Sequence, residues 1–117
     1  MGYVTKKIAQ ILEGVDALIL ESNYDKAMLK SGPYPDYLKN RIASDRGHLD
    51  NEICARFAAY LAESGTGCIV LGHLSAENNT PEIALGGVES QFISQNISYF
   101  KDVEKHCGVV ENSVEMV

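Results

Sequence analysis

The chain has 117 residues, 45% of them hydrophobic and 22% charged, the balance of one globular domain or of a piece of a larger one. No apolar run reaches the roughly 18 residues that span a bilayer, so we expect no membrane anchor. The formal net charge of −6 argues against a general nucleic-acid coat protein, because non-specific binding depends on lysine and arginine neutralising phosphates.

Three cysteines, Cys54, Cys68 and Cys107, are scattered along the chain and form no CxxC pair. An odd, scattered set predicts reduced thiols and a cytoplasmic location rather than a disulfide framework. Two of the three lie in apolar runs, where cysteine packs as a small hydrophobic residue.

Helical and strand-like segments alternate along the first half of the chain. Val4–Leu12 has apolar residues at helical spacing, with Val4, Ile8, Ile11 and Leu12 on one face. Asp16–Glu21 contains a continuous apolar run, which is typical of a strand that is buried on both faces. Two short helices are predicted next, over Asp25–Lys30 and Asp36–Ala43.

The second half contains the clearest helix. Asp50–Glu63 keeps helical spacing, and Asp50 is a suitable N-cap. Cys68–Leu71 follows as a second buried strand. We expect the runs Leu18–Leu20 and Ile69–Leu71 to be neighbouring parallel strands, with the Asp50–Glu63 helix on one face.

A last helix is predicted where Thr80 can cap and Pro81 can occupy the first helical position. Its apolar face would carry Ile83, Ala84, Val88 and Phe92. The segment Val103–Val117 could hold one or two further strands.

This order of elements predicts an α/β fold built on a βαβ unit with flanking helices. Two strands and several helices do not easily make a self-sufficient sheet, and the run Leu18–Leu20 needs apolar neighbours on both faces. We therefore expect residues 1–117 to form a single partial domain. The cover would come from a partner chain or from the rest of the domain.

Three ionisable residues converge on one edge of the expected sheet, where strand ends and helix starts meet and ligands generally bind. Glu21 ends the first strand, His48 precedes the long helix and His73 ends the second strand. His73 could be a metal ligand, and His48 could move a proton with Glu21 orienting its ring. The alternatives are a solvent-facing acid and two surface or capping histidines. His106 has no partner at ligand spacing.

Five bases lie between Lys26 and Arg46 against two acids. They predict either a local basic patch or a solvated helix face. Lys39, Arg41 and Arg46 are the candidates for contacts with any bound phosphate group.

Three stretches together resemble the metallo-β-lactamase-fold metallohydrolases, and most of all the WalJ-type branch with exonuclease-like activity. They are Ala17–Asn23, Ser44–Leu49 and Gly72–Glu82, and Ser31–Pro35 also fits that branch. The resemblance runs from Gly2 to about Glu82 and weakens towards Gln95. It implies the C-terminal half of an αββα fold.

By this resemblance His73 is the last metal-binding histidine of the family. Glu21 and His48 resemble the acid and histidine that protonate the leaving oxygen in the tRNase Z branch, although Leu20 stands where that motif has a histidine. The family's HxHxDH motif, a further histidine and a bridging aspartate are expected upstream of Gly2. The resemblance therefore implies that this chain alone binds zinc or manganese weakly and is inactive.

The intact protein implied by the resemblance hydrolyses phosphodiesters of nucleic acid with metal-activated water. One alternative is a non-enzymatic fragment that folds as a homodimer or with its missing N-terminal half. Another is a small-molecule ester or thioester hydrolase, because this fold hosts many chemistries.

Overall fold

A three-stranded parallel sheet forms the centre of the computed structural model, which describes residues 2–98 and 108–109. The strands are β1 (Ala17–Glu21), β2 (Cys68–Gly72) and β3 (Gly108–Val109), in the order β1-β2-β3. Leu18 pairs with Ile69 and Leu20 with Leu71, so the two apolar runs are neighbouring parallel strands. The predicted α/β class and this strand pairing are confirmed.

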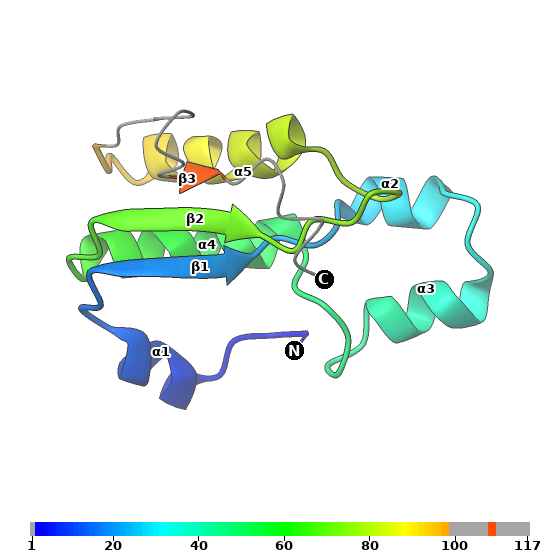
Figure 1. Cartoon of the computed structure of the whole chain (residues 1–117), viewed down its shortest axis with the longest axis horizontal. Coiled ribbons are helices and arrows are strands. Elements are labelled where there is room, and N and C mark those ends of the chain that lie inside the picture. Colours follow the sequence, from blue (N-terminus) through cyan, green and yellow to red (C-terminus); the bar gives the residue numbers. More distant parts are fainter. Residues whose placement is uncertain (1, 99–107, 110–117) are drawn as a thin grey trace.

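Two long helices, α4 (Asn51–Glu63) and α5 (Pro81–Ser94), lie on one side of the sheet and pack against each other (Figure 1). The shorter α1 (Lys6–Leu12) lies near the start of β1. The helices α2 (Lys26–Ser31) and α3 (Asp36–Ile42) extend beyond the carboxyl ends of the strands. The sheet edge that carries the candidate site thus faces α2, α3 and the loops next to them.

Both long helices begin at the capping residues that the sequence predicted. Asp50 Oδ1 accepts hydrogen bonds from the main-chain N–H groups of Glu52 and Ile53, at 2.8 and 3.0 Å. Thr80 Oγ1 accepts from the N–H of Ile83 at 3.1 Å, and Pro81 follows at the first helical position. These bonds satisfy donors that a helix start would otherwise leave unpaired.

Side-chain and turn hydrogen bonds shift some other boundaries from their predicted positions. α1 begins at Lys6 rather than Val4, because the hydroxyl of Thr5 caps it by accepting from Ile8 N–H at 3.1 Å. β1 begins after Asp16, whose carbonyl accepts from the N–H groups of Gly67 and Cys68 in the neighbouring turn.

The next two helices differ from prediction at their ends by one residue. Asp25 lies outside α2 as its N-cap, and its carboxylate accepts from Met28 N–H at 3.0 Å. Helix α2 then runs one residue beyond Lys30, to Ser31. At the end of α3, Ala43 is the C-cap rather than the last helical residue.

The hydrophobic core lies between the sheet and the pair α4 and α5. Leu61 and Leu71 are fully buried there, and burying such a side chain contributes about 1.5–3 kcal/mol. Small residues such as Ala58 and Ala84 are also fully buried in this core. On α5 the predicted apolar face is confirmed at three positions, but Ile83 is 40% exposed.

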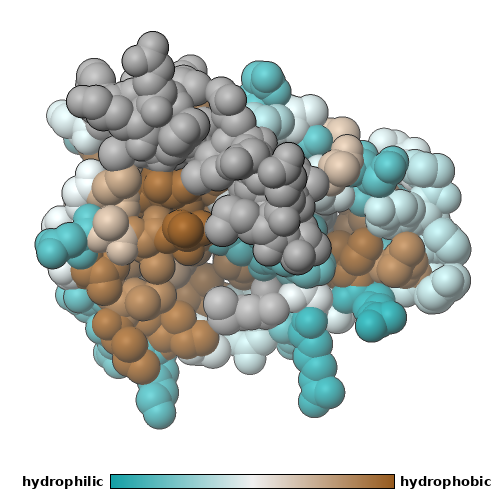
Figure 2. All heavy atoms as spheres, in the orientation of Figure 1, coloured by the Kyte–Doolittle hydropathy of each residue, from teal (hydrophilic) through white to brown (hydrophobic). Residues whose placement is uncertain are grey.

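The other face of the sheet is open in the described part of the chain. Ile19 of β1 is 57% exposed and Ile11 of α1 is 67% exposed. Figure 2 shows a hydrophobic surface over β1, β2 and α1 on the side opposite α4. No element between residues 2 and 98 covers the second face of β1, for which the sequence analysis expects a cover from a partner chain or from the rest of the domain.

At the C-terminal end the structure describes one short strand. Gly108–Val109 form β3, parallel to β2, within the segment Val103–Val117, for which the sequence allows one or two strands. The remaining residues of that segment lie outside the described ones. None of the helices described here has the length and apolar character needed to cross a membrane.

Candidate active site at the carboxyl edge of the sheet

Glu21, the last residue of β1, is the centre of the site. Its Oε2 lies 2.8 Å from Nδ1 of His48 and 2.5 Å from Nδ1 of His73. Its other oxygen, Oε1, accepts a hydrogen bond from the main-chain N–H of Leu49 at 2.9 Å. Both oxygens are therefore engaged, and one of them contacts two imidazole rings.

The two histidines meet edge to face above this carboxylate. Their ring centroids are 4.9 Å apart and their planes cross at 78°. One ligand-type atom from each of Glu21, His48 and His73 lies within 4.8 Å of the others. The sequence prediction that these three residues cluster, with Glu21 in hydrogen-bonding reach of His48, is confirmed.

The contact between Glu21 and His73 was not predicted. It follows from the register in which β1 and β2 pair. Glu21 is paired with Gly72 across the sheet, so the next residue, His73, emerges beside the carboxylate. Two apolar runs of similar length allow several registers, and the sequence alone does not select one.

The hydrogen bonds fix which ring nitrogen points to the carboxylate. An ionised carboxylate can only accept, so each Nδ1 must carry the proton in these contacts. A neutral imidazole then has its lone pair on Nε2. Within residues 2–98, neither Nε2 makes a hydrogen bond, so both remain available to a metal, a proton or a substrate.

His73 has an uncommon backbone conformation at the end of β2. Its φ is 57°, in the left-handed region, which costs about 1–2 kcal/mol for a residue other than glycine. Its carbonyl accepts a hydrogen bond from Asn23 Nδ2 at 2.7 Å. Strained backbone of this kind is concentrated at functional sites.

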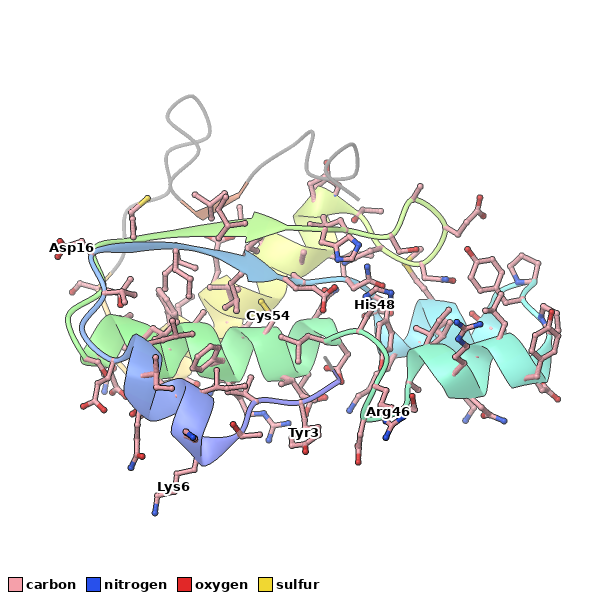
Figure 3. All side chains as sticks on the ribbon, turned by 60° about the horizontal axis from the view of Figure 1, so that its bottom comes forward. Tyr3, Lys6, Asp16, Arg46, His48 and Cys54 are labelled. Carbon is pink, nitrogen blue, oxygen red and sulfur yellow. The ribbon has the colours of Figure 1, made fainter. Side chains whose placement is uncertain are left out.

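His48 is held by a tight loop that follows α3. Its main-chain N–H donates to the carbonyl of Ile42 at 3.1 Å, and Gly2 N–H donates to Asp45 O at 2.8 Å. A Cβ on Gly47 would lie 2.0 Å from Ile42 O, and one on Gly2 would lie 2.0 Å from Ser44 O. Only glycine permits these approaches. Figure 3 shows His48 near the end of β1 and Arg46 on the loop that leads to it.

Sequence reasoning missed a buried amide network behind the site. Asn51 and Asn79 exchange side-chain hydrogen bonds at 2.8 and 2.9 Å. Ser22 donates to Asn51 Oδ1 at 2.6 Å, and its carbonyl accepts from Asn79 Nδ2 at 2.7 Å. The network joins the residue after Glu21 to the starts of α4 and α5. The signal was the asparagine pair Asn78-Asn79, which lies in the Gly72–Glu82 stretch that carries the resemblance and also indicates a turn before Thr80.

The predicted phosphate-contacting bases divide between a cavity and open surface. Lys39 lines a cavity of about 580 Å³ with Lys26 and Lys30, beside the start of α4. Its Nζ also donates to the carbonyl of Lys30 at 2.7 Å. Arg41 and Arg46 are exposed and do not line this cavity. The three predicted bases are thus not brought together at one point.

Acids balance the bases around the cavity. Asp36, Asp45 and Asp50 line it as well, and Lys26 lies 3.7 Å from the carboxylate of Asp50. Tyr24 is also in the lining. Its pKa is raised, first by burial and then by the charges of Asp50 and Glu21.

A buried thiol has a large pKa shift. Cys54 lies on α4 between the helix and the sheet and is fully buried (Figure 3). Burial raises its pKa from 9.0 to about 12. The expectation that this cysteine packs as a small hydrophobic residue is confirmed.

The three clustered residues fit a metal site only in part. Two ligand atoms on one tetrahedral zinc at about 2.1 Å lie about 3.4 Å apart. The distances from Glu21 Oε2 to the two Nδ1 atoms are 2.5 and 2.8 Å, which are those of hydrogen bonds. Metal-ligating histidines commonly donate their second N–H to a carboxylate in this way. The atom that suits a metal is therefore Nε2 of His73, with Glu21 behind it.

Comparisons with known proteins found curated relatives over part of the chain. It is 46% identical over 83 residues to the exodeoxyribonuclease WalJ of Streptococcus pneumoniae strain D39. It is 42% identical over 83 residues to the exodeoxyribonuclease YycJ of Bacillus anthracis. In both comparisons the match covers 71% of this chain but 31% of the relative, so the chain spans about a third of the length of these relatives.

No protein-family profile and no solved structure matches the chain. The curated matches support the predicted similarity to WalJ-type exonucleases. The chain is therefore similar to a stretch of each of two proteins that are named exodeoxyribonucleases.

Proposed function

We propose that this chain is the C-terminal half of a metal-dependent phosphodiesterase that acts on nucleic acid. The observation that carries the proposal is the pair of contacts from Glu21 Oε2 to Nδ1 of His48 and of His73. These contacts keep the proton of each ring on Nδ1, so both Nε2 atoms can accept a ligand at the sheet edge where ligands bind in α/β folds. The similarity to proteins named exodeoxyribonucleases supports the choice of substrate.

In the proposed site His73 holds a divalent metal, zinc or manganese, through Nε2. Bound there, the metal would activate water and offset the charge on the phosphate. Glu21 keeps the proton of His73 on Nδ1, which directs the lone pair of Nε2 outward.

His48 is proposed as the proton donor to the leaving oxygen. With a proton on each ring nitrogen, it donates from Nε2 while Glu21 holds the Nδ1–H and stabilises the imidazolium. Arg46, which precedes His48 by two residues, with Arg41 and Lys39 on α3, is proposed to contact substrate phosphates.

Residues outside those described are needed to complete this site. A catalytic zinc site ordinarily has three protein ligands and an open position, and His73 supplies one. Between residues 2 and 98 no element covers the open face of the sheet around Ile19. We propose that an N-terminal half, or a second copy of the chain, supplies that cover, and that with the N-terminal half the fold is the αββα metallo-β-lactamase fold.

The test is to fuse this chain behind the part of the pneumococcal relative that precedes the stretch of similarity. Bound metal is counted by elemental analysis, and hydrolysis is followed on labelled single- and double-stranded DNA. The fusion should bind metal stoichiometrically, whereas the bare chain should bind it weakly. His73→Ala should weaken metal binding. His48→Ala should spare it and slow hydrolysis by about 10²–10⁴-fold.

The basic residues are tested separately by DNA affinity. Arg46→Ala should weaken DNA binding and reduce its salt dependence, because one phosphate contact is lost. Lys6→Ala is the matched control, since Lys6 points away from His48 on α1 (Figure 3). Tight stoichiometric metal in the bare chain, or chelator-resistant hydrolysis by it, would contradict the proposal.

A further inference from the structure

Asn23 contacts three segments of the candidate site, although it is neither an acid nor a histidine. It lies two residues beyond Glu21 and is 7% exposed. Its side-chain Nδ2 donates to the carbonyl of His73 at 2.7 Å. Its main-chain N–H donates to Leu49 O at 3.0 Å, and its carbonyl accepts from Ser75 N–H at 2.8 Å. It thus bonds to His73 itself and to the residue after His48.

Two of these bonds hold the chain at the strained residue and two positions after it. His73 has a φ of 57°, which a residue other than glycine adopts only where the surroundings enforce it. The bond from Asn23 Nδ2 fixes the His73 carbonyl, and the bond from Ser75 N–H fixes the chain two residues later. Leu74, between them, is 1% exposed and anchored in the core.

We propose that Asn23 is a positioning residue whose carboxamide holds His73 in the left-handed conformation and so directs the His73 ring to Glu21. A relaxed backbone at His73 would rotate the Cα–Cβ bond and carry the ring away from Oε2. The relevance of this role to hydrolysis rests on the proposed function. The role itself concerns only the geometry of the folded chain.

A purely structural role predicts a different result from a positioning role. If the Asn23 amide only satisfies a buried carbonyl, its loss should lower stability and leave the His73 ring where it is. If it positions His73, its loss should release that ring selectively. The ring of His48 should keep its contact, because the bond from Asn23 to Leu49 uses the main chain.

The experiment is imidazole ¹H–¹⁵N NMR on the 117-residue chain without metal, at one fixed pH. Signals are assigned with His48→Gln and His73→Gln. The key variant is Asn23→Asp, which keeps the shape of the side chain but removes the N–H donor. The matched control is Asn79→Asp, an equally buried amide that bonds to Ser22 and Asn51 instead of His73.

In Asn23→Asp we expect the downfield Nδ1–H signal of His73 to be lost and that of His48 to be retained. In Asn79→Asp both should be retained, whatever the change in melting temperature. Retention of the His73 signal in folded Asn23→Asp would overturn the proposal. This readout needs neither metal nor nucleic acid, so it can fail or succeed independently of the proposed hydrolysis.

A second measurement applies even if Asn23→Asp folds poorly. Glycine adopts positive φ without strain, so His73→Gly removes the need for a clamp. Asn23→Ser should therefore lower the urea midpoint of unfolding less in the His73→Gly protein than in the unmodified chain. Equal falls in the two backgrounds would overturn the proposal.

Discussion

Oε2 of Glu21 lies 2.5 Å from Nδ1 of His73, although 52 positions separate the two residues in the chain. The same oxygen accepts from His48, while the other carboxylate oxygen accepts from the N–H of Leu49. The carboxylate therefore receives three hydrogen bonds and donates none. A side chain of the same shape that carries an N–H donor cannot reproduce this arrangement.

Glu21→Gln should change the tautomer of at least one histidine. If the oxygen of the new side-chain amide keeps the bond to Leu49, the amide nitrogen faces both histidine rings. That nitrogen can only donate, so an Nδ1 that contacts it must accept. The proton of that ring then moves to Nε2. An Nε2 that carries a proton cannot bind metal. Imidazole ¹⁵N shifts should report the change. In the fusion with an N-terminal half, metal affinity should fall about 10–100-fold, the usual effect of losing such a carboxylate.

The control for this substitution is Glu77→Gln, which removes an exposed acid just after His73 in the chain that makes no ion pair among the described residues. It should leave the imidazole spectra and the metal affinity unchanged. Unchanged histidine spectra in Glu21→Gln would contradict the hydrogen-bonding roles assigned to Glu21.

Gly47→Ala should displace the loop that presents His48. The new Cβ would lie 2.0 Å from Ile42 O and 2.6 Å from Arg41 O, both of them main-chain atoms that cannot move aside cheaply. We expect a lower urea midpoint and loss of the Nδ1 signal of His48. Gly86→Ala is the control, because a Cβ there meets nothing within 4 Å and alanine favours the α5 helix by about 1 kcal/mol. Equal midpoints for the two variants would contradict the close packing of this loop.

Much of the fold was predictable because local chemistry determines it. The structure confirms the predicted helix starts at Asp50 and Thr80 and the two strands in the apolar runs. Each of these depends on residues that lie close together in the chain. The clustering of Glu21, His48 and His73 followed from a topological rule about strand ends.

The parts that could not be predicted depend on long-range geometry. The register that brings Glu21 beside His73, the left-handed backbone of His73 and the bond from Asn23 to its carbonyl arise only when β1 and β2 pair. The exposure of Ile19 agrees with the expected partial domain, but the continuous apolar run of β1 does not indicate which segment would cover it.

The thiol of Cys54 should make stability depend on alkaline pH. Its pKa is 9.0 in the unfolded reference and about 12 in the folded chain, because burial disfavours the thiolate. Between these values the unfolded state loses the proton and the folded state keeps it, so the unfolded state is favoured as pH rises. The free energy of unfolding should therefore fall above pH 9, by up to about 1.4 kcal/mol per pH unit, and the effect should be absent below pH 9.

Two variants isolate this effect from other titrating groups. Cys54→Ala and Cys54→Ser do not ionise, so urea unfolding at pH 8 to 11 should give both a shallower decline than the unmodified chain. Tyr24, whose pKa is also raised, is retained in all three proteins and cancels in the comparison. Parallel pH dependences for the three proteins would show that Cys54 is not protected in the folded state.

The open face of the sheet should make the isolated chain self-associate. Ile19 on β1 and Ile11 on α1 are 57% and 67% exposed. Figure 2 shows a hydrophobic surface over these two elements, and contiguous apolar patches commonly mark interfaces. Sedimentation velocity should show a concentration-dependent dimer or larger species.

Ile19→Thr keeps a β-branched residue in the strand but removes apolar area, so it should weaken association. Ile93→Thr is the matched control, since Ile93 is 65% exposed on α5, which packs on the other side of the sheet. It should leave association unchanged. Fusion to an N-terminal half should abolish association if that half covers Ile19. A monomer at every concentration, or equal effects of the two threonine variants, would show that this face is not where copies meet.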